Sequence, residues 1–292
     1  MKSPLDRAAL AREITALANG QVVVPDGAVD GCCARRIAIT GSPGAGKSTL
    51  SAHLARLRAK DQRYGILAVD PSSPKSGGAI LGDRIRIDEL DGTSDLYVRS
   101  LGSRNSNDGL ADNLPAILET MDRHLFDEVI LETVGVGQAD YAVRALVDTV
   151  VLVLHPESGD IVQAMKAGIM EMADLFVMNK SDLPAAEKSA GDIKRVLSIT
   201  HRDSGEWEPR VINTSSKNPE SIVRLSEAID AHRAWLDAQG SLNLRAKNQK
   251  HYVLRRSLAV LIDDAISRLP ETYTSLSIAE QRTWILSNLE ND

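Results

Sequence analysis

The feature that most constrains the fold is an eight-residue pattern near the start of the chain. Its residues are Gly41, Ser42, Pro43, Gly44, Ala45, Gly46, Lys47 and Ser48. They match the phosphate-loop pattern G-x-x-x-x-G-K-[ST] at every fixed position. An apolar run at 36–40 predicts a strand before the loop, and apolar residues at helical spacing over 49–57 predict a helix after it. Such a loop binds phosphate through backbone N–H groups and the positive end of the helix, so the pattern predicts a nucleotide site.

Individual residues of this stretch have expected roles. Lys47 is expected to reach the β- and γ-phosphates of the nucleotide, and the Ser48 hydroxyl to bind Mg²⁺. The predicted nucleotide-binding residues here are those at 41–48 together with Thr49.

Strand-like and helix-like runs alternate from residue 35 to about residue 236. Further strands are predicted at 64–70, 96–99, 128–132, 149–154, 175–179 and 210–213, and helices at 110–124, 160–172, 186–199 and 219–236. Pro115 lies inside the first of these helices, which predicts a kink or a late start there. Aliphatic strands that alternate with helices indicate a mostly parallel sheet covered on both faces, the three-layer α/β sandwich of P-loop NTPases.

Helical segments flank this domain on both sides. We expect an N-terminal helical arm and linker at 1–34, a nucleotide-binding domain at 35–238 and a C-terminal helical arm at 239–292. Leu254, Leu258, Leu261, Ile262, Ala265 and Leu269 form an apolar stripe in this last segment. The stripe can pack on its own domain or on a second copy of the chain, and its length and terminal place favour a homodimer.

Composition excludes several classes of partner. The formal net charge of the 292-residue chain is −6, which argues against a nucleic-acid-binding surface, since such a surface is basic. No apolar run approaches the length of about 18 residues that a membrane span needs, so we expect no membrane segment. The only cysteines are the adjacent Cys32 and Cys33, which form no spaced disulfide framework, so a cytoplasmic location fits best.

Acidic residues follow two predicted strands and one glycine-containing loop. Asp70 and Glu132 stand at strand ends, where a phosphate-loop enzyme needs carboxylates for Mg²⁺ or its water. Asp83 follows paired glycines and is a further candidate for the metal shell. Locally, Asp70 can equally be a turn cap, and for Asp83 a solvated loop carboxylate is the stronger local interpretation. Gly135 can bring a backbone N–H to the γ-phosphate, so Lys47, Asp83, Glu132 and Gly135 are the candidate catalytic residues.

A second pattern predicts which base is bound. Asn179, Lys180 and Asp182 form N-K-x-D directly after a predicted strand. The carboxylate can accept hydrogen bonds from guanine N1–H and the exocyclic amine, a donor pair that adenine lacks. Ser215, Ser216 and Lys217 follow the last strand and resemble the loop that contacts the guanine carbonyl oxygen. The predicted ligands are therefore GTP or GDP with Mg²⁺.

These motifs also resemble those of one GTPase family. The stretches GSPGAGKSTL, AVDPSSP, GGAILGDR, ETVGVGQ, GDIVQAMKAGIMEMAD and NKSD together are similar to the MeaB/ArgK family. The resemblance runs from about residue 35 to about residue 236. It implies phosphate and magnesium contacts for Lys47 and Ser48, metal-site positions for Asp70, Asp83 and Glu132, base contacts for Asn179, Lys180 and Asp182, and a switch segment at 156–166.

The resemblance further implies a biological role. Such proteins are G-protein chaperones of adenosylcobalamin-dependent acyl-CoA mutases of the methylmalonyl-CoA mutase type. They gate cofactor loading, protect the mutase and dimerise through C-terminal helices. The predicted motifs contain no evident arginine finger, so we expect slow hydrolysis that a partner stimulates.

Other functions stay open at this point. One is metal delivery to a nickel enzyme, although the six histidines form no close cluster in the sequence. Another is a divergent family member with a different client. A third is a transport ATPase or kinase, against which the N-K-x-D pattern argues.

Overall fold

A computed structural model describes residues 4–19, 33–60, 62–71, 95–103, 113–133, 142–157, 169–200, 203 and 205–289. The chain divides into two compact units, Met1–Leu242 and Asn243–Asp292. The three-part division expected from the sequence stays a prediction.

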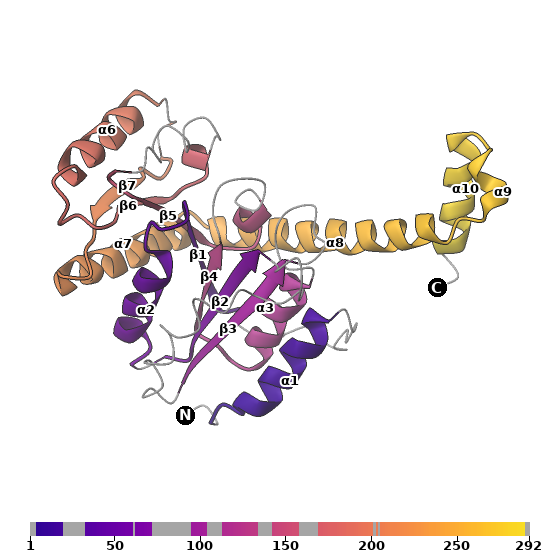
Figure 1. The fold of residues 1–292 in the computed structure, drawn as a ribbon, viewed down its shortest axis with the longest axis horizontal. Helices are drawn as coiled ribbons and strands as arrows, with labels where there is room; N and C mark the ends of the chain where they lie inside the picture. Colours follow the sequence, from indigo (N-terminus) through magenta and orange to yellow (C-terminus); the bar gives the residue numbers. More distant parts are fainter. Residues whose placement is uncertain are drawn as a thin grey trace. The chain divides into compact units, whose positions relative to one another are not determined.

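The first unit is built on a parallel sheet (Figure 1). Its strands are β1 (Arg35–Thr40), β2 (Tyr64–Pro71), β3 (Leu96–Ser103), β4 (Glu128–Thr133), β5 (Thr149–Leu154), β6 (Leu175–Met178) and β7 (Arg210–Asn213). They are ordered β3-β2-β4-β1-β5-β6-β7, and every neighbouring pair is parallel. The predicted α/β class is therefore confirmed. Strand β3 runs four residues beyond the predicted 96–99, because pairing with β2 continues to Ser103 although the apolar pattern has ended.

Helices form the outer layers of this unit. They are α1 (Arg7–Ala18), α2 (Lys47–Arg58), α3 (Leu114–Arg123), α6 (Ala186–Ile199), α7 (Pro219–Ala238) and the short 3-10 helix η3 (Ile169–Glu171). Helix α3 begins late, with Pro115 in its first turn, where a missing N–H costs nothing. Of the helix predicted at 160–172, residues 160–168 lie outside the described residues.

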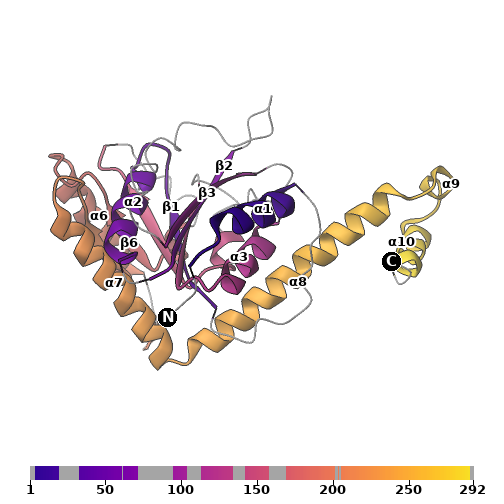
Figure 2. The ribbon, with the colours of Figure 1, turned by 90° about the horizontal axis from the view of Figure 1, so that it is seen from below.

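Alternating side chains of β5 divide the core between the two faces of the sheet. Val151 and Val153 belong to the cluster that includes α2 and α7, whereas Leu152 and Leu154 belong to the cluster that includes α6. Successive strand residues point to opposite faces, so α2 and α7 cover one face and α6 the other. Figure 2 shows α2 and α7 on one side of the sheet and the paired α1 and α3 on the other. The three predicted layers are present.

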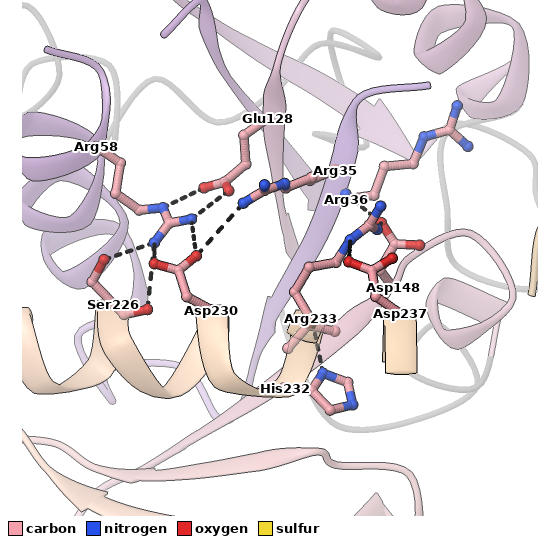
Figure 3. Close-up of polar contacts among 11 residues, drawn as sticks. Arg35, Arg36, Arg58, Glu128, Asp148, Ser226, Asp230, His232, Arg233 and Asp237 are labelled. Carbon is pink, nitrogen blue, oxygen red and sulfur yellow. Dashed lines mark hydrogen bonds and ion pairs between the residues drawn. The ribbon is translucent and has the colours of Figure 1, made fainter. Parts of the chain in front are cut away.

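A buried ion pair holds α2 against β4 at the end away from the phosphate loop (Figure 3). Arg58 Nε and Nη2 donate to Glu128 Oε1 and Oε2, both at 2.6 Å. The same guanidinium donates to Asp230 at 2.9 and 3.1 Å and to Ser226 Oγ at 2.7 Å, both on α7. Burial favours the neutral guanidine, but hydrogen bonds to Glu128 and Asp230 outweigh it and raise the pKa of Arg58. One side chain thus joins α2, β4 and α7.

The second unit is helical. Helix α8 (Ser241–Ser267) leads into it, and α9 (Glu271–Thr274) and α10 (Ile278–Leu289) follow. A capping box opens α10, because Ser277 N and Oγ donate to Glu280 Oε2 at 2.9 and 2.7 Å. The apolar stripe includes exposed side chains at Leu254, Leu258, Leu261 and Ile262. Within the described ranges, no helix combines the length and apolar character that crossing a membrane requires.

Candidate functional site

The phosphate loop joins β1 to α2 through backbone conformations that suit glycine. Gly41, Gly44 and Gly46 have φ angles of 136°, 80° and 92°. At Gly41, a Cβ atom would lie 2.0 Å from the carbonyl oxygen of Val153 on β5, so only glycine fits. The loop therefore lies directly against the neighbouring strand, and α2 starts where it ends.

Lys47 is the first residue of α2, and its side chain folds back over the loop. Its Nζ donates to the carbonyl oxygens of Gly41 and Ser42 at 2.8 and 3.0 Å. The residue is 8% exposed. These carbonyls hold the ammonium at the loop, where an ionised lysine can neutralise phosphate charge.

Glu132 meets the start of α2 from the end of β4. It pairs in register with Ile39 of β1 and Ala68 of β2, so it lies in the centre of the sheet. Ser48 Oγ donates to Glu132 Oε1 at 2.6 Å. A hydroxyl and a carboxylate side by side are the hard oxygen donors that Mg²⁺ prefers, so the residues present fit that ion.

The remaining predicted metal and catalytic residues are less fully described. Asp70 occupies the penultimate position of β2, two residues beyond Ala68, which pairs with Glu132. Asp83 and Gly135 lie outside the described residues, as do 158–166 of the predicted switch segment. Their roles stay predictions.

Asn179 connects the base-reading pattern to the phosphate loop. Its Nδ2 donates to the carbonyl oxygen of Ala45 at 2.8 Å, and its Oδ1 accepts from Thr214 Oγ1 at 3.0 Å. Lys180 adds a second link, since its Nζ donates to the carbonyl oxygen of Gly44 at 3.1 Å. Two segments 134 to 136 residues apart in the chain are thereby brought together at the carboxyl ends of the parallel strands.

Asp182 receives both of its nearest donors from the loop after β7. Ser215 Oγ donates to Oδ1 at 2.7 Å, and Lys217 Nζ donates to Oδ2 at 2.6 Å. The hydrogen bond from Lys217 and then that from Ser215 lower the pKa of Asp182 to about 2. The side chain is therefore a carboxylate at neutral pH, as the reading of guanine donors requires. Ser216, between the two donors, is exposed.

Ser51 also reaches this site, although no pattern in the sequence singled it out. This residue is 1% exposed and lies one helical turn after Ser48. Its Oγ is 3.0 Å from the carbonyl oxygen of Lys47 and 3.2 Å from Glu132 Oε2. Its spacing from Ser48 could have indicated this contact, because residues three apart share a helix face.

The described residues bring together a phosphate loop, a hydroxyl and a carboxylate that suit a metal ion, and a second carboxylate that suits guanine. This arrangement suits a guanine nucleotide, and its hydroxyl and carboxylate oxygens are of the kind that Mg²⁺ prefers. Within the described ranges, no group of three or more His, Cys, Asp or Glu side chains is placed to hold a metal ion.

Comparison with known proteins points to one family of GTPases. The profile of the family described as methylmalonyl Co-A mutase-associated GTPase MeaB matches residues 23–270. A putative GTPase of Pyrococcus abyssi is 38% identical over 217 residues, 73% of this chain and 67% of its own. The GTPase ArgK of Escherichia coli is 35% identical over 225 residues, 76% of this chain and 68% of its own. The chain thus spans about two thirds of the length of these relatives.

A mouse relative and a crystal structure also match the chain. The mouse protein named methylmalonic aciduria type A homolog, mitochondrial, is 35% identical over 218 residues, 73% of this chain and 52% of its own. A crystal structure described as a LAO/AO transport system kinase superposes with a TM-score of 0.63 at 23% identity, over 99% of this chain and 100% of that one. The superposition shows a shared fold. The family profile and these relatives show that the chain belongs to the MeaB family of GTPases.

Proposed function

We propose that this chain is a Mg²⁺-dependent GTPase that acts as a chaperone for an adenosylcobalamin-dependent acyl-CoA mutase of the methylmalonyl-CoA mutase type. It would gate cofactor loading and protect the mutase. The family description, which names a methylmalonyl-CoA mutase, supports the client. The observation that carries the nucleotide chemistry is the contact of Ser48 with Glu132 beside the phosphate loop.

The residues near the phosphates would have separate roles. Lys47 would exchange its loop carbonyls for phosphate oxygens, and the loop N–H groups would bind the same phosphates. Ser48 and Glu132, with Asp70 and Asp83, would hold Mg²⁺, which when bound neutralises charge that develops on the phosphates.

The base end would supply selectivity. Asp182 would accept the two guanine donors, while Asn179 and Lys180 keep this segment against the phosphate loop. Ser215, Ser216 and Lys217 would line the other side of the base. ATP would bind more weakly than GTP, because adenine leaves the Asp182 carboxylate without its donor pair.

Hydrolysis is proposed to be slow until a partner binds. The segments around Asp83 and Gly135 would be ordered by GTP and Mg²⁺ and released by GDP, which would give the client two states to distinguish. The chaperone would work in the cytoplasm.

We further propose that the chain forms a homodimer through its C-terminal helices. Support comes from the apolar side chains at Leu254, Leu258, Leu261 and Ile262, which a single chain leaves exposed. Light scattering of the purified chain and of a Leu258→Glu variant measures the oligomeric state of each. A dimer that the variant converts to monomer is expected, and a monomeric parent protein would contradict it.

The test of the chaperone role uses the purified chain and an apo-mutase. The rate of adenosylcobalamin loading is measured with GTP, GDP and a non-hydrolysable GTP analogue. Loading that differs between GTP and its analogue supports gating. Equal loading in all three states, with GTP hydrolysis intact, would leave a GTPase with another client. Lys47→Ala is the control, since it should lose the nucleotide dependence.

A second arm distinguishes metal delivery. The tagged chain is recovered from cells in each nucleotide state, and the bound proteins are identified. Nucleotide-dependent recovery of a nickel enzyme, together with stoichiometric nickel binding, would replace the mutase proposal. Recovery of a cobalamin-dependent mutase would strengthen it.

A further inference from the structure

Ser51 is a buried hydroxyl that the phosphate-loop pattern does not include. It lies on α2, whose first turn carries Lys47 and Ser48, and it faces Glu132 on β4. Its hydroxyl carries one proton and has two acceptors within reach, the carbonyl oxygen of Lys47 at 3.0 Å and Glu132 Oε2 at 3.2 Å.

The carboxylate is the acceptor that gains more from this proton. Ser51 lies four positions after Lys47 in the same α-helix, so the Lys47 carbonyl accepts the Ser51 backbone N–H. Hydrogen bonds to an ionised acceptor are roughly twice as strong as those to a neutral one. The Ser51 hydroxyl therefore has more to contribute at Glu132 than at the helix carbonyl.

The two serines hold different oxygens of the same carboxylate. Ser48 Oγ is 2.6 Å from Oε1 of Glu132, and Ser51 Oγ is 3.2 Å from Oε2. The last torsion of a glutamate is soft, so a hydroxyl contact at one oxygen still allows the carboxylate plane to turn. A second contact at the other oxygen restricts that rotation.

We propose that Ser51 is a positioning residue for the metal site: its hydroxyl holds Oε2 of Glu132 and so keeps Oε1 against the Ser48 hydroxyl. The inference rests on the proposed function, in which Ser48 and Glu132 hold Mg²⁺. It adds a requirement that the phosphate-loop pattern does not state, namely a hydroxyl one turn beyond the metal-binding serine.

The test uses the full chain and a fluorescent GDP. Its affinity is measured first in EDTA and then across a Mg²⁺ titration, for the parent protein and Ser51→Ala. Alanine favours helix and leaves the Lys47 carbonyl its backbone partner, so the variant is expected to fold. A hydrogen bond to a charged group is worth enough to shift the half-saturating Mg²⁺ concentration about tenfold upward. GDP affinity in EDTA should change less than about twofold, since Ser51 touches no predicted nucleotide contact except through Lys47.

Two controls separate positioning from a general loss of packing. Thr120 on α3 is a matched buried hydroxyl that donates to the carbonyl oxygen of Ala116, four residues earlier, at 2.9 Å. Thr120→Val should leave the Mg²⁺ titration unchanged. In a Glu132→Ala background, Ser51→Ala should shift the titration by less than about twofold, because the carboxylate on which it acts is gone.

The possible failures are distinguishable. A Mg²⁺ titration of Ser51→Ala within twofold of the parent, with a Mg²⁺-dependent parent, would overturn the role of Ser51 and leave the proposed function standing. An equal shift from Ser51→Ala in the Glu132→Ala background would also overturn it. A GDP affinity of the parent protein that does not change with Mg²⁺ concentration would overturn the proposed metal site itself.

Discussion

The two ends of the contact between α2 and β4 use the same residue type for different purposes. Glu128 and Glu132 lie four residues apart on β4, so both point to the face that α2 covers, with Ile130 between them in the core. At the far end, which is the end away from the phosphate loop, Arg58 binds both oxygens of Glu128 (Figure 3). At the near end, which lies beside the phosphate loop, serine hydroxyls bind the two oxygens of Glu132.

The difference is in what each donor can still do. A guanidinium has five donors and no acceptor, so its bidentate pair with Glu128 is closed to a cation. A hydroxyl that donates its proton keeps lone pairs, so Ser48 can bind a cation while it still donates to Glu132. The far end therefore holds the layers together, and the near end keeps hydroxyl lone pairs that would serve the proposed Mg²⁺.

The largest expected effect comes from breaking the far end. Arg58→Met would leave the Glu128 carboxylate, which is 0% exposed, without its bidentate partner. Loss of one member of a buried pair costs about 3–5 kcal/mol in the free energy of unfolding. Denaturant unfolding followed by circular dichroism measures it.

A double variant tests the reason for that loss. Arg58→Met combined with Glu128→Met removes both charges, and a buried pair replaced by apolar side chains is often neutral in stability. Most of the lost stability should return. A single variant that loses less than about 1 kcal/mol would show that the ion pair is not what joins α2 to β4.

The next effect separates the two glutamates by function. Glu132→Gln should slow GTP hydrolysis about 100-fold, as removal of one preorganised polar group in an active site does. Its stability should change little, since an amide oxygen still accepts from Ser48. Glu128→Gln is the matched control and should do the reverse, with stability lost and hydrolysis by the folded fraction retained. If both variants lost hydrolysis equally, the proposed division between the ends would be wrong.

The same contrast marks the limit of what the sequence predicts. The phosphate loop and N-K-x-D place their residues because each is a short pattern with a local mechanism, and the alternating runs predict the parallel sheet. Arg58 and Glu128 are 70 residues apart, and a charged residue on a helix is normally solvated. No local pattern pairs them. Ser51 was missed for a related reason, because its partner is 81 residues away.

The smallest effect tests an exposed ion pair against the buried one. Lys217 and Asp182 are 77% and 31% exposed at their side chains, so their pair should contribute little to folding. Lys217→Met should raise the pKa of Asp182 from about 2 toward its ordinary value, because the hydrogen bond from Lys217 is the largest cause of the shift. Carboxyl NMR titration measures this pKa, and Ser215→Ala should move it less.

The pH range of any stability effect follows from the sign of that shift. A carboxyl whose pKa is lowered on folding stabilises the protein above its unfolded pKa, near 3.9, and loses that contribution as pH falls toward 2. Unfolding midpoints of Lys217→Met and the parent should differ most at neutral pH, by a small amount, and converge below pH 2. A midpoint loss as large as that of Arg58→Met would mean that exposure does not distinguish the two pairs. A pKa of Asp182 unmoved by Lys217→Met would assign the shift to Ser215 and the backbone instead.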